Sequence, residues 1–357
     1  MDHRSFGGGW SGLRHGGPKG PHYILIKALG TLYGAAASWR RRWYARHPDR
    51  QRRLARPVIS VGNISVGGSG KTPLVEHIAR LLASTGERPS ILTRGYGRRL
   101  SGPGATVVSD GSRVLACVDE SGDEPLMLAR ALQHDGVVVV VGADRYVSGL
   151  LAENRLGATV HILDDGFQHF GLARDVDLLA TSEHDLHDQP LPAGRLRETL
   201  VSASAADAAL VDAGYLPAAE RVGRALGVAT VFRVTRTLEP PRMVKTGETV
   251  VVPAGSRVFA VTGIARPDRF FSDLTASGWN VVGALAFRDH HQFRRADLVR
   301  IEREARKAAA AIVLTTAKDA VRLGEDDLRD LPLALVPLRA SIEPAADFLT
   351  WLRERLP

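Results

Sequence analysis

Short apolar runs alternate with helical stretches along the first two thirds of the chain. Such runs are typical of buried strands. They fall at residues 58–61, 90–93, 137–141, 160–163, 176–179 and 208–211. Alternation of this kind predicts an α/β fold with a mostly parallel sheet covered by helices.

The pattern changes near residue 232, where short runs of mixed polarity replace the apolar ones. We expect strands at 233–236 and 249–252, separated by Glu239-Pro240-Pro241, and together they predict a two-stranded linker between domains. A second, smaller α/β unit begins at residue 258, and its further expected strands lie at 281–284, 311–316 and 333–336. A chain of 357 residues has room for both domains.

The N-terminal region precedes the first strand. Residues 1–21 are rich in Gly, His and Arg, so we expect them to be disordered. Residues 23–39 are mostly apolar, and a cluster of arginines with Trp43 and Tyr44 follows them. The run is short and interrupted by Lys27, which disfavours a transmembrane helix, and a basic cluster that follows the apolar run disfavours a signal peptide. The composition favours an interfacial helix on an anionic membrane, with a helix packed on the core as the alternative.

The stretch 58–73 joins an apolar run, a glycine-rich turn and the start of a helical pattern. Strand, glycine loop, Lys-Thr and helix form the context of a phosphate-binding P-loop, in which backbone N–H groups surround the anion. Lys71 would reach the β- and γ-phosphates, and the Thr72 hydroxyl would ligate Mg²⁺. The candidate nucleotide-binding residues are Ser65, Val66, Gly67, Gly68, Ser69, Gly70, Lys71 and Thr72.

One position departs from the general P-loop pattern. The usual motif begins with glycine where this chain has Ser65. The alternative is a strand-to-helix turn that only happens to contain Gly, Lys and Thr. The strand before it and the helix after it favour binding of a nucleoside triphosphate, without saying what is done with it.

The overall charge narrows the class of partner. A formal net charge of +8 favours an anionic one. The sequence contains no aromatic-rich RNA-binding signature and no recognisable helix-turn-helix, so a membrane surface or a phosphorylated substrate is favoured over nucleic acid. The single Cys117 excludes a disulfide framework and a cysteine zinc site, as expected in a reducing cytosol.

Carboxylates follow one of the expected strands. The strand at 160–163 ends in Asp164 and Asp165, where P-loop enzymes hold Mg²⁺, and an ordinary Asp-Gly turn is the alternative. Phe167-Gln168-His169 adds polar groups to the same edge. A further carboxylate, Asp123, precedes a helical stretch, where it would be either a helix cap or a catalytic base.

Histidines and arginines supply the remaining candidates. His290 and His291 follow an aspartate, and they could bind metal, orient a base or simply occupy a loop. Arg94 and Arg197 lie in glycine-containing loops, which suits phosphate recognition, although a solvated basic surface is the alternative. We expect Arg94, Arg197 and His169 to contact the substrate.

Several of these stretches together resemble the tetraacyldisaccharide 4′-kinase family of lipid A biosynthesis. They occur in the family's order over roughly residues 22–340, and a serine at position 65 is similar to what the family carries. The matching motifs are 61–73, Thr93-Arg94-Gly95-Tyr96-Gly97, Gly122-Asp123-Glu124-Pro125, Asp164-Asp165-Gly166-Phe167-Gln168-His169, Pro192-Ala193-Gly194 with Leu196-Arg197-Glu198, and Phe287 with Asp289-His290.

The resemblance implies an ATP- and Mg²⁺-dependent kinase that phosphorylates the 4′-hydroxyl of an acylated glucosamine disaccharide 1-phosphate to give lipid IVA. It implies Asp123 as the base with His290 as its partner, and a metal site that includes Asp164, Asp165 and Thr72 with Glu124 near it. It places the enzyme at the cytoplasmic face of the inner membrane, as a peripheral or monotopic protein.

The implied fold is two α/β/α sandwich domains joined by a two-stranded β linker, with a membrane-surface helix at the N-terminus. We therefore divide the chain into five segments. They are a disordered extension (1–21), an interfacial helix (22–47), a P-loop kinase domain (48–231), the linker (232–256) and a C-terminal α/β domain (257–357).

Two other classes of function fit the P-loop. One is a GTPase or ATPase switch or metal-insertion accessory protein, although the guanine-reading Asn-Lys-x-Asp is only approached, by Thr316-Ala317-Lys318-Asp319. The other is a membrane-bound nucleotide sensor that transfers no phosphate. Transfer of a labelled γ-phosphate to the lipid acceptor separates these classes from a kinase.

Overall fold

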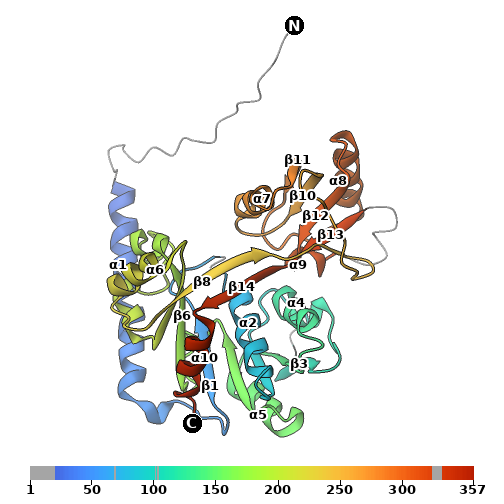
Figure 1. Ribbon diagram of the computed structural model, residues 1–357. Helices are drawn as coiled ribbons and strands as arrows, with labels where there is room; N and C mark the ends of the chain where they lie inside the picture. Colours follow the sequence, from blue (N-terminus) through green and yellow to red (C-terminus); the bar gives the residue numbers. More distant parts are fainter. Residues whose placement is uncertain (1–20, 68–69, 101, 103, 324–331) are drawn as a thin grey trace.

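The computed structural model describes residues 21–67, 70–100, 102, 104–323 and 332–357. Two three-layer α/β/α units, each with its own sheet, make up the fold (Figure 1). The expected fold class is confirmed, and the expected disorder of residues 1–21 lies, apart from its last residue, outside the described part of the chain.

The larger sheet belongs to the first unit. Its nine strands are, in spatial order, β14 (Leu338–Glu343), β8 (Val231–Leu238), β7 (Ala208–Asp212), β6 (Val176–Ser182), β1 (Val58–Gly62), β5 (Val160–Asp164), β2 (Pro89–Thr93), β4 (Val138–Gly142) and β3 (Ala105–Asp110). The strands from β8 to β4 are parallel, and the two edge strands pair antiparallel. The carboxyl ends of the parallel strands therefore meet along one edge, which is where such sheets bind ligands.

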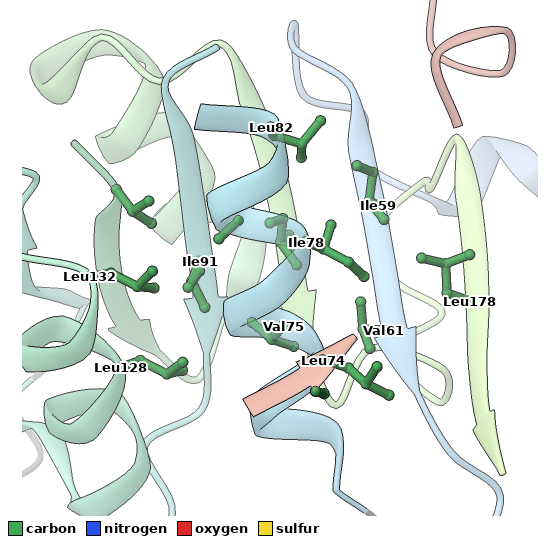
Figure 2. Close-up of a cluster of buried hydrophobic side chains, with 14 of the residues drawn as sticks. Ile59, Val61, Leu74, Val75, Ile78, Leu82, Ile91, Leu128, Leu132 and Leu178 are labelled. Carbon is green, nitrogen blue, oxygen red and sulfur yellow. The ribbon is translucent and has the colours of Figure 1, made fainter. Parts of the chain in front are cut away.

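Helices cover both faces of this sheet. Figure 2 shows α2 (Lys71–Ala83) lying against the sheet, with Leu74, Val75, Ile78 and Leu82 turned toward Ile59 and Val61 of β1 and Ile91 of β2. The same face is covered by α4 (Asp123–Ala131) and α10 (Ala345–Arg353), and the opposite face by α5 (Arg145–Leu156) and α6 (Leu216–Leu226). This packing fixes the position of α2, which begins near the carboxyl end of β1.

The smaller sheet is also covered by helices on both faces. Its strands are, in spatial order, β11 (Asn280–Ala286), β10 (Arg257–Thr262), β12 (Ile312–Thr316), β13 (Leu333–Val336) and β9 (Arg242–Met243). Helix α8 (Arg295–Lys307) packs on one face and α7 (Pro267–Ala276) on the other. A short helix, α9 (Ala317–Ala320), follows β12 directly.

The connection between the units differs from the expected linker. Residues 249–252 form no strand, apart from an isolated bridge between Thr249 and Arg242, and Val250 and Val252 pack on the second core instead. The antiparallel partner of β8 is β14, by which the chain returns to the large sheet (Figure 1). The expectation of a strand at 249–252 in the linker is therefore wrong.

The end of the chain also belongs to the first unit. Ala340 and Ile342 of β14 and Phe348 and Leu352 of α10 are buried in the core beneath α2. Phe232 of β8 makes an edge-to-face contact with Phe348, at 5.1 Å between ring centroids. The expected C-terminal domain of 257–357 is thus too long at its end, because these apolar side chains complete the large sheet.

The N-terminal helix α1 (Pro21–Arg46) runs along the side of the first unit (Figure 1). Gly30 and Gly34 are buried, since a Cβ at either would lie within about 3 Å of Pro190 and of Ala193 or Thr199. No helix in the described ranges is long and apolar enough to span a bilayer.

Candidate active site

The glycine-rich turn leaves β1 and leads into α2. Val66 N donates to the carbonyl of Arg195 at 2.7 Å, and Arg197 N donates to the carbonyl of Ile64 at 2.6 Å. Gly67 and Gly70 have φ of +101° and +75°, a conformation that glycine adopts without strain. Of the expected nucleotide-binding residues, Gly68 and Ser69 lie outside the described residues.

Lys71 begins α2 and lies between two acceptors. Its Nζ is 2.9 Å from Oδ1 of Asn63 and 3.1 Å from Oδ1 of Asp165. Arg197 Nη1 donates to the other carboxylate oxygen, Asp165 Oδ2, at 2.7 Å. Burial favours a neutral Asp165, but Lys71 and Arg197 outweigh it and hold the pKa of this carboxyl below its usual range. The P-loop lysine, the end of β5 and the loop at 195–197 therefore meet.

Asp164 occupies a different environment from its neighbour. It is buried at the end of β5, and within the described residues its hydrogen-bond donor is Thr93 Oγ1 at 3.2 Å. Burial, followed by the negative charge of Glu124, raises the pKa of Asp164 to about 7. A divalent cation would supply the positive charge that this buried carboxyl lacks.

The other candidate ligands do not form a closed metal site by themselves. Across the ranges that the structure describes, no group of three or more His, Cys, Asp or Glu side chains could hold a metal ion. Glu124 lies near enough to Asp164 to perturb its pKa, and Thr72 follows Lys71 in the first turn of α2. Mg²⁺ is usually held by one or two carboxylates together with phosphate oxygens, so an incomplete set of protein ligands fits this metal.

Asp123 lies across from the second unit and is bound by it. His290 Nδ1 and Arg322 Nε both lie 2.8 Å from Asp123 Oδ2. The N-cap position of α4 is occupied by Gly122 and Asp123 is the first residue of the helix, so the helix-cap interpretation is not supported. Burial would raise the pKa of Asp123, but the His290 hydrogen bond and then the Arg322 charge lower it. The carboxylate is therefore ionised and can accept a proton.

The two adjacent histidines have different roles. His290, in the loop between β11 and α8, has φ of +58°, and its ring contacts Asp123. His291 Nε2 instead pairs with Asp297 Oδ2 at 2.9 Å, and its ring stacks on Phe287 at 4.6 Å between centroids. Only His290 of this pair contacts the candidate base.

The three expected substrate-binding residues, Arg94, His169 and Arg197, have different surroundings. Arg94 is exposed after β2, and its charge acts on Arg145, which is buried at the start of α5 and also senses the charge of Asp164. Burial, followed by the charges of Arg145 and Arg174, lowers the pKa of His169 to about 4, so this ring is neutral near pH 7. Arg197 is already paired with Asp165.

The sequence alone did not indicate several residues that lie close to the P-loop and the candidate catalytic residues. Arg145 lies just after the end of β4. A charged residue just after a parallel strand is a candidate for ligand binding, so its position in the sequence could have indicated it. Gly70 is approached by the Arg236 guanidinium from β8, close enough that a Cβ there would clash. Lys318 and Arg322 follow β12 and reach His290 and Asp123. Nothing in the local pattern marked Arg236 or Arg322.

A cavity of about 820 Å³ opens beside the start of the P-loop. Its lining includes Ser65 and Gly67 of the loop, Asp212 and Tyr215 after β7, and Arg266 and Arg269 from the second unit. Asp212 Oδ2 accepts from Arg269 Nη2 at 2.7 Å. The cavity therefore lies at the carboxyl edge of the large sheet, between the two units.

A family model matches most of the chain. The model described as tetraacyldisaccharide-1-P 4′-kinase matches residues 22–357. The chain belongs to this family. The resemblance noted in the sequence is confirmed.

Individual 4′-kinase relatives match over most of their length. The tetraacyldisaccharide 4′-kinase of Desulfotalea psychrophila is 38% identical over 331 residues, covering 90% of this chain and 93% of the relative. That of Geobacter metallireducens is 40% identical over 304 residues, covering 84% and 88%. Among solved structures, LpxK from Aquifex aeolicus in complex with ATP matches with a TM-score of 0.75 at 29% identity, covering 94% of this chain and all of that one.

The raised pKa of Asp164 predicts a pH-dependent stability in this 4′-kinase family member. The folded chain holds the proton up to about pH 7, whereas the unfolded chain loses it near 3.8. Between these values the folded state binds more protons, so stability falls as pH rises through the window. We expect Asp164→Asn to raise the melting temperature of the ligand-free protein more at about pH 8 than at about pH 5.

Calorimetric melting at both pH values, in the presence of a chelator, measures this difference. Asp49→Asn is the control, because Asp49 is largely exposed and pairs with Arg50 on the surface. An Asp164→Asn effect of equal size at the two pH values would contradict the assignment of a protonated, buried carboxyl.

Proposed function

We propose that this chain transfers the γ-phosphate of ATP to the 4′-hydroxyl of a tetraacylated glucosamine disaccharide 1-phosphate, giving lipid IVA in lipid A biosynthesis. Family membership over residues 22–357 supports this reaction. The observation that carries the mechanism is the ionised Asp123, held by His290 across the two units while the adjacent Glu124 acts on Asp164 near Lys71. A phosphoryl-transfer enzyme needs a triphosphate site and a proton acceptor that face each other.

The triphosphate would bind at the start of α2. Backbone N–H groups of residues 65–72 and the positive end of the helix dipole suit its oxygens. Lys71 is held by Asn63 and Asp165, so its ammonium is already positioned at the carboxyl edge of the sheet. Support comes from the solved relative, which is in complex with ATP.

The nucleoside would occupy the cavity beside the loop. Its volume of about 820 Å³ is in the range of small-molecule sites. Tyr215, which is 56% exposed, offers a ring face on which a base can stack, and Ser65 and Gly67 connect the cavity to the phosphate site. This placement follows the general rule for the switch point of an open parallel sheet.

Thr72, Glu124, Asp164 and Asp165 would hold Mg²⁺, which neutralises charge on the phosphates when bound. The residues fit this ion because they offer oxygen ligands. Among the described residues, the buried Asp164 carboxyl also forms no ion pair with a cationic side chain, and a bound cation would stabilise its ionised form. Arg197 and Lys71 already neutralise Asp165, so Asp164 is the stronger candidate of the two neighbouring acids.

Asp123 would take the proton of the acceptor hydroxyl. His290 and Arg322 both contact Oδ2, which leaves Oδ1 for the sugar oxygen. As the hydroxyl oxygen bonds to the γ-phosphorus, its proton passes to Asp123 and the bond to the β-phosphate oxygen breaks, releasing ADP. Arg94, Arg145 and His169 lie at neighbouring strand ends, where Arg94 and Arg145 suit the anionic group of the substrate and the neutral His169 suits a hydroxyl.

Helix α1 would place the enzyme on the cytoplasmic face of the inner membrane, where an acylated substrate resides. Gly30 and Gly34 pack on the protein, whereas several apolar side chains of the same helix remain exposed. They are Ile24, Leu25, Ile26, Leu29, Leu32, Tyr33 and Trp39. An apolar surface of this kind is typical of helices that lie in the bilayer interface.

The arginines at the end of α1 have two different roles, one in holding the helix to the protein and one at the membrane surface. Arg41 makes a two-pronged ion pair with Glu198, at 2.7 and 2.8 Å, and is only 11% exposed. It therefore holds the helix to the protein, whereas the exposed Arg42 and Arg46 remain for lipid phosphates. Glu198 also accepts from Gln168, which donates to the carbonyl of Asn63, so the helix is tied to the P-loop.

The catalytic assignment is tested by Asp123→Asn. We expect a loss of about 10²-fold or more in kcat with an ATP dissociation constant changed by less than about twofold, because the amide cannot accept the proton. The assay transfers labelled γ-phosphate to the disaccharide 1-phosphate and resolves the lipids by chromatography. Asp119→Asn, at a half-exposed acid of the short helix α3 (Val118–Ser121) that pairs with Arg99, is the matched control.

Three outcomes distinguish the classes of function. Labelled lipid from the wild-type protein supports a kinase, nucleotide hydrolysis without labelled lipid supports a switch, and ATP binding with neither supports a sensor. Near-normal transfer by Asp123→Asn would remove the base assignment while leaving the kinase reaction intact.

The membrane assignment is tested by Leu25→Ser combined with Leu32→Ser. The two positions are exposed and two helical turns apart, so both would enter the lipid. We expect binding to vesicles of phosphatidylethanolamine and phosphatidylglycerol to fall by about tenfold or more, since each buried leucine contributes roughly 1.5–3 kcal/mol. Flotation with the vesicles measures this binding.

The matched control replaces two exposed apolar residues elsewhere, Val251→Ser with Val299→Ser in the second unit. Equal flotation of the α1 variant and this control would contradict a lipid-facing α1.

A further inference from the structure

The segment 316–322 approaches the guanine-reading motif in sequence but lies elsewhere in the fold. It follows β12 in the second unit, whereas the P-loop cavity is lined by other segments. Two of its cations reach the candidate catalytic pair. Lys318 Nζ is 3.3 Å from His290 Nε2, and Arg322 Nε is 2.8 Å from Asp123 Oδ2. The segment therefore contacts both members of the pair.

Asp319 anchors this segment. It is completely buried and accepts from Thr262 Oγ1 at 2.8 Å and from Thr316 Oγ1 at 2.7 Å. The backbone N–H of Gly263 also points at it, at 3.1 Å. An aspartate at this position of the motif therefore ties the turn after β12 to the end of β10, so the cations on either side of it are held in place.

Arg322 is held just as firmly. Its side chain has no solvent exposure and forms an ion pair with Asp319 at 3.3 Å. It also donates from Nη1 to the carbonyl of His291 at 3.1 Å. The backbone of the histidine loop is thereby fixed to the same turn, which restricts where the His290 ring can lie.

The contact between Lys318 and His290 constrains the histidine tautomer. An ammonium has three donors and no acceptor, so the ring nitrogen facing it has to accept. His290 Nε2 is then without a proton, and Nδ1 carries the proton that it donates to Asp123 Oδ2. Lys318 also lies 3.3 Å from Glu124 and 3.5 Å from Asp289, which keeps its ammonium between the two units.

We infer that Lys318 is a positioning residue for the kinase reaction, which sets the tautomer and orientation of His290 so that this histidine holds Asp123 Oδ2 and leaves Oδ1 for the acceptor. The inference rests on the proposed function for its kinetic consequence, but the tautomer itself does not. The near-match to a guanine motif thus serves the catalytic pair rather than a nucleotide base.

The kinetic test is Lys318→Met, since removal of the fully buried Arg322 would disturb the fold. We expect kcat to fall about tenfold, with the KM for ATP changed by less than about twofold, because an orienting contact is lost and no nucleotide contact is. Lys318→Arg should restore part of the loss, since it keeps a donor toward Nε2. Arg303→Met, an exposed basic residue of α8, is the control.

A coupling measurement separates positioning from a general structural effect. In a His290→Ala background, Lys318→Met should change kcat by less than about twofold, because its target is gone. An equal loss in both backgrounds, or no loss in the wild-type background, would overturn the inference.

Nitrogen NMR of the histidine-labelled full chain tests the tautomer without any turnover. The His290 signal, assigned by its loss in His290→Ala, should show a protonated Nδ1 and a bare Nε2 at mildly alkaline pH. A protonated Nε2 would overturn the inference. If the wild-type protein phosphorylates no lipid, the proposed function fails, and this spectrum still decides the tautomer.

Discussion

The hydrogen bond between Asp123 and His290 is the contact on which the site depends, because its two partners belong to different α/β units. Asp123 begins α4 of the first unit, and His290 lies between β11 and α8 of the second. The candidate catalytic pair therefore exists only while the units keep their relative position. The antiparallel pairing of β8 with β14 provides that restraint, since it carries the chain out of the large sheet and back again.

Burial and charge then give each carboxylate near the P-loop a different state. Asp165 is neutralised by Lys71 and Arg197, whereas Asp123 is kept ionised by His290 and Arg322 against the effect of burial. Among the residues that the structure describes, Asp164 has no comparable partner, and its pKa rises to about 7. Three acids along one sheet edge are thereby suited to three tasks, which are to hold the lysine, to accept a proton and to bind a cation.

The sequence predicted the parts of this arrangement that have a local signature. Apolar runs located the parallel strands, and the Gly-Lys-Thr turn located the start of α2. The partner of β8 was missed because a pairing between residues near 235 and 340 leaves no trace in local periodicity, and 249–252 offered a nearer apolar run. Likewise, the arginine cluster after residue 39 was interpreted as part of a helix on an anionic membrane, but the pairing of Arg41 with Glu198 depends on the tertiary structure.

Within the site, contacts between residues that are distant in the sequence were again the ones that the sequence did not predict. Asp123 and His290 were proposed as partners through family resemblance, since a separation of 167 positions conceals the contact. Lys318 was visible only as part of an imperfect guanine motif, and Arg322 belonged to no motif. Side chains that act through another residue need not follow a glycine turn or a strand end, so composition and spacing do not mark them.

The most direct measurement of the central claim is a double-mutant cycle on kcat with Asp123→Ala, His290→Ala and the combined variant, at saturating ATP and lipid acceptor. If the pair acts as one unit across the two domains, the combined variant is slower than Asp123→Ala by less than about twofold. Losses that multiply would show that the two residues act independently, which would contradict the account.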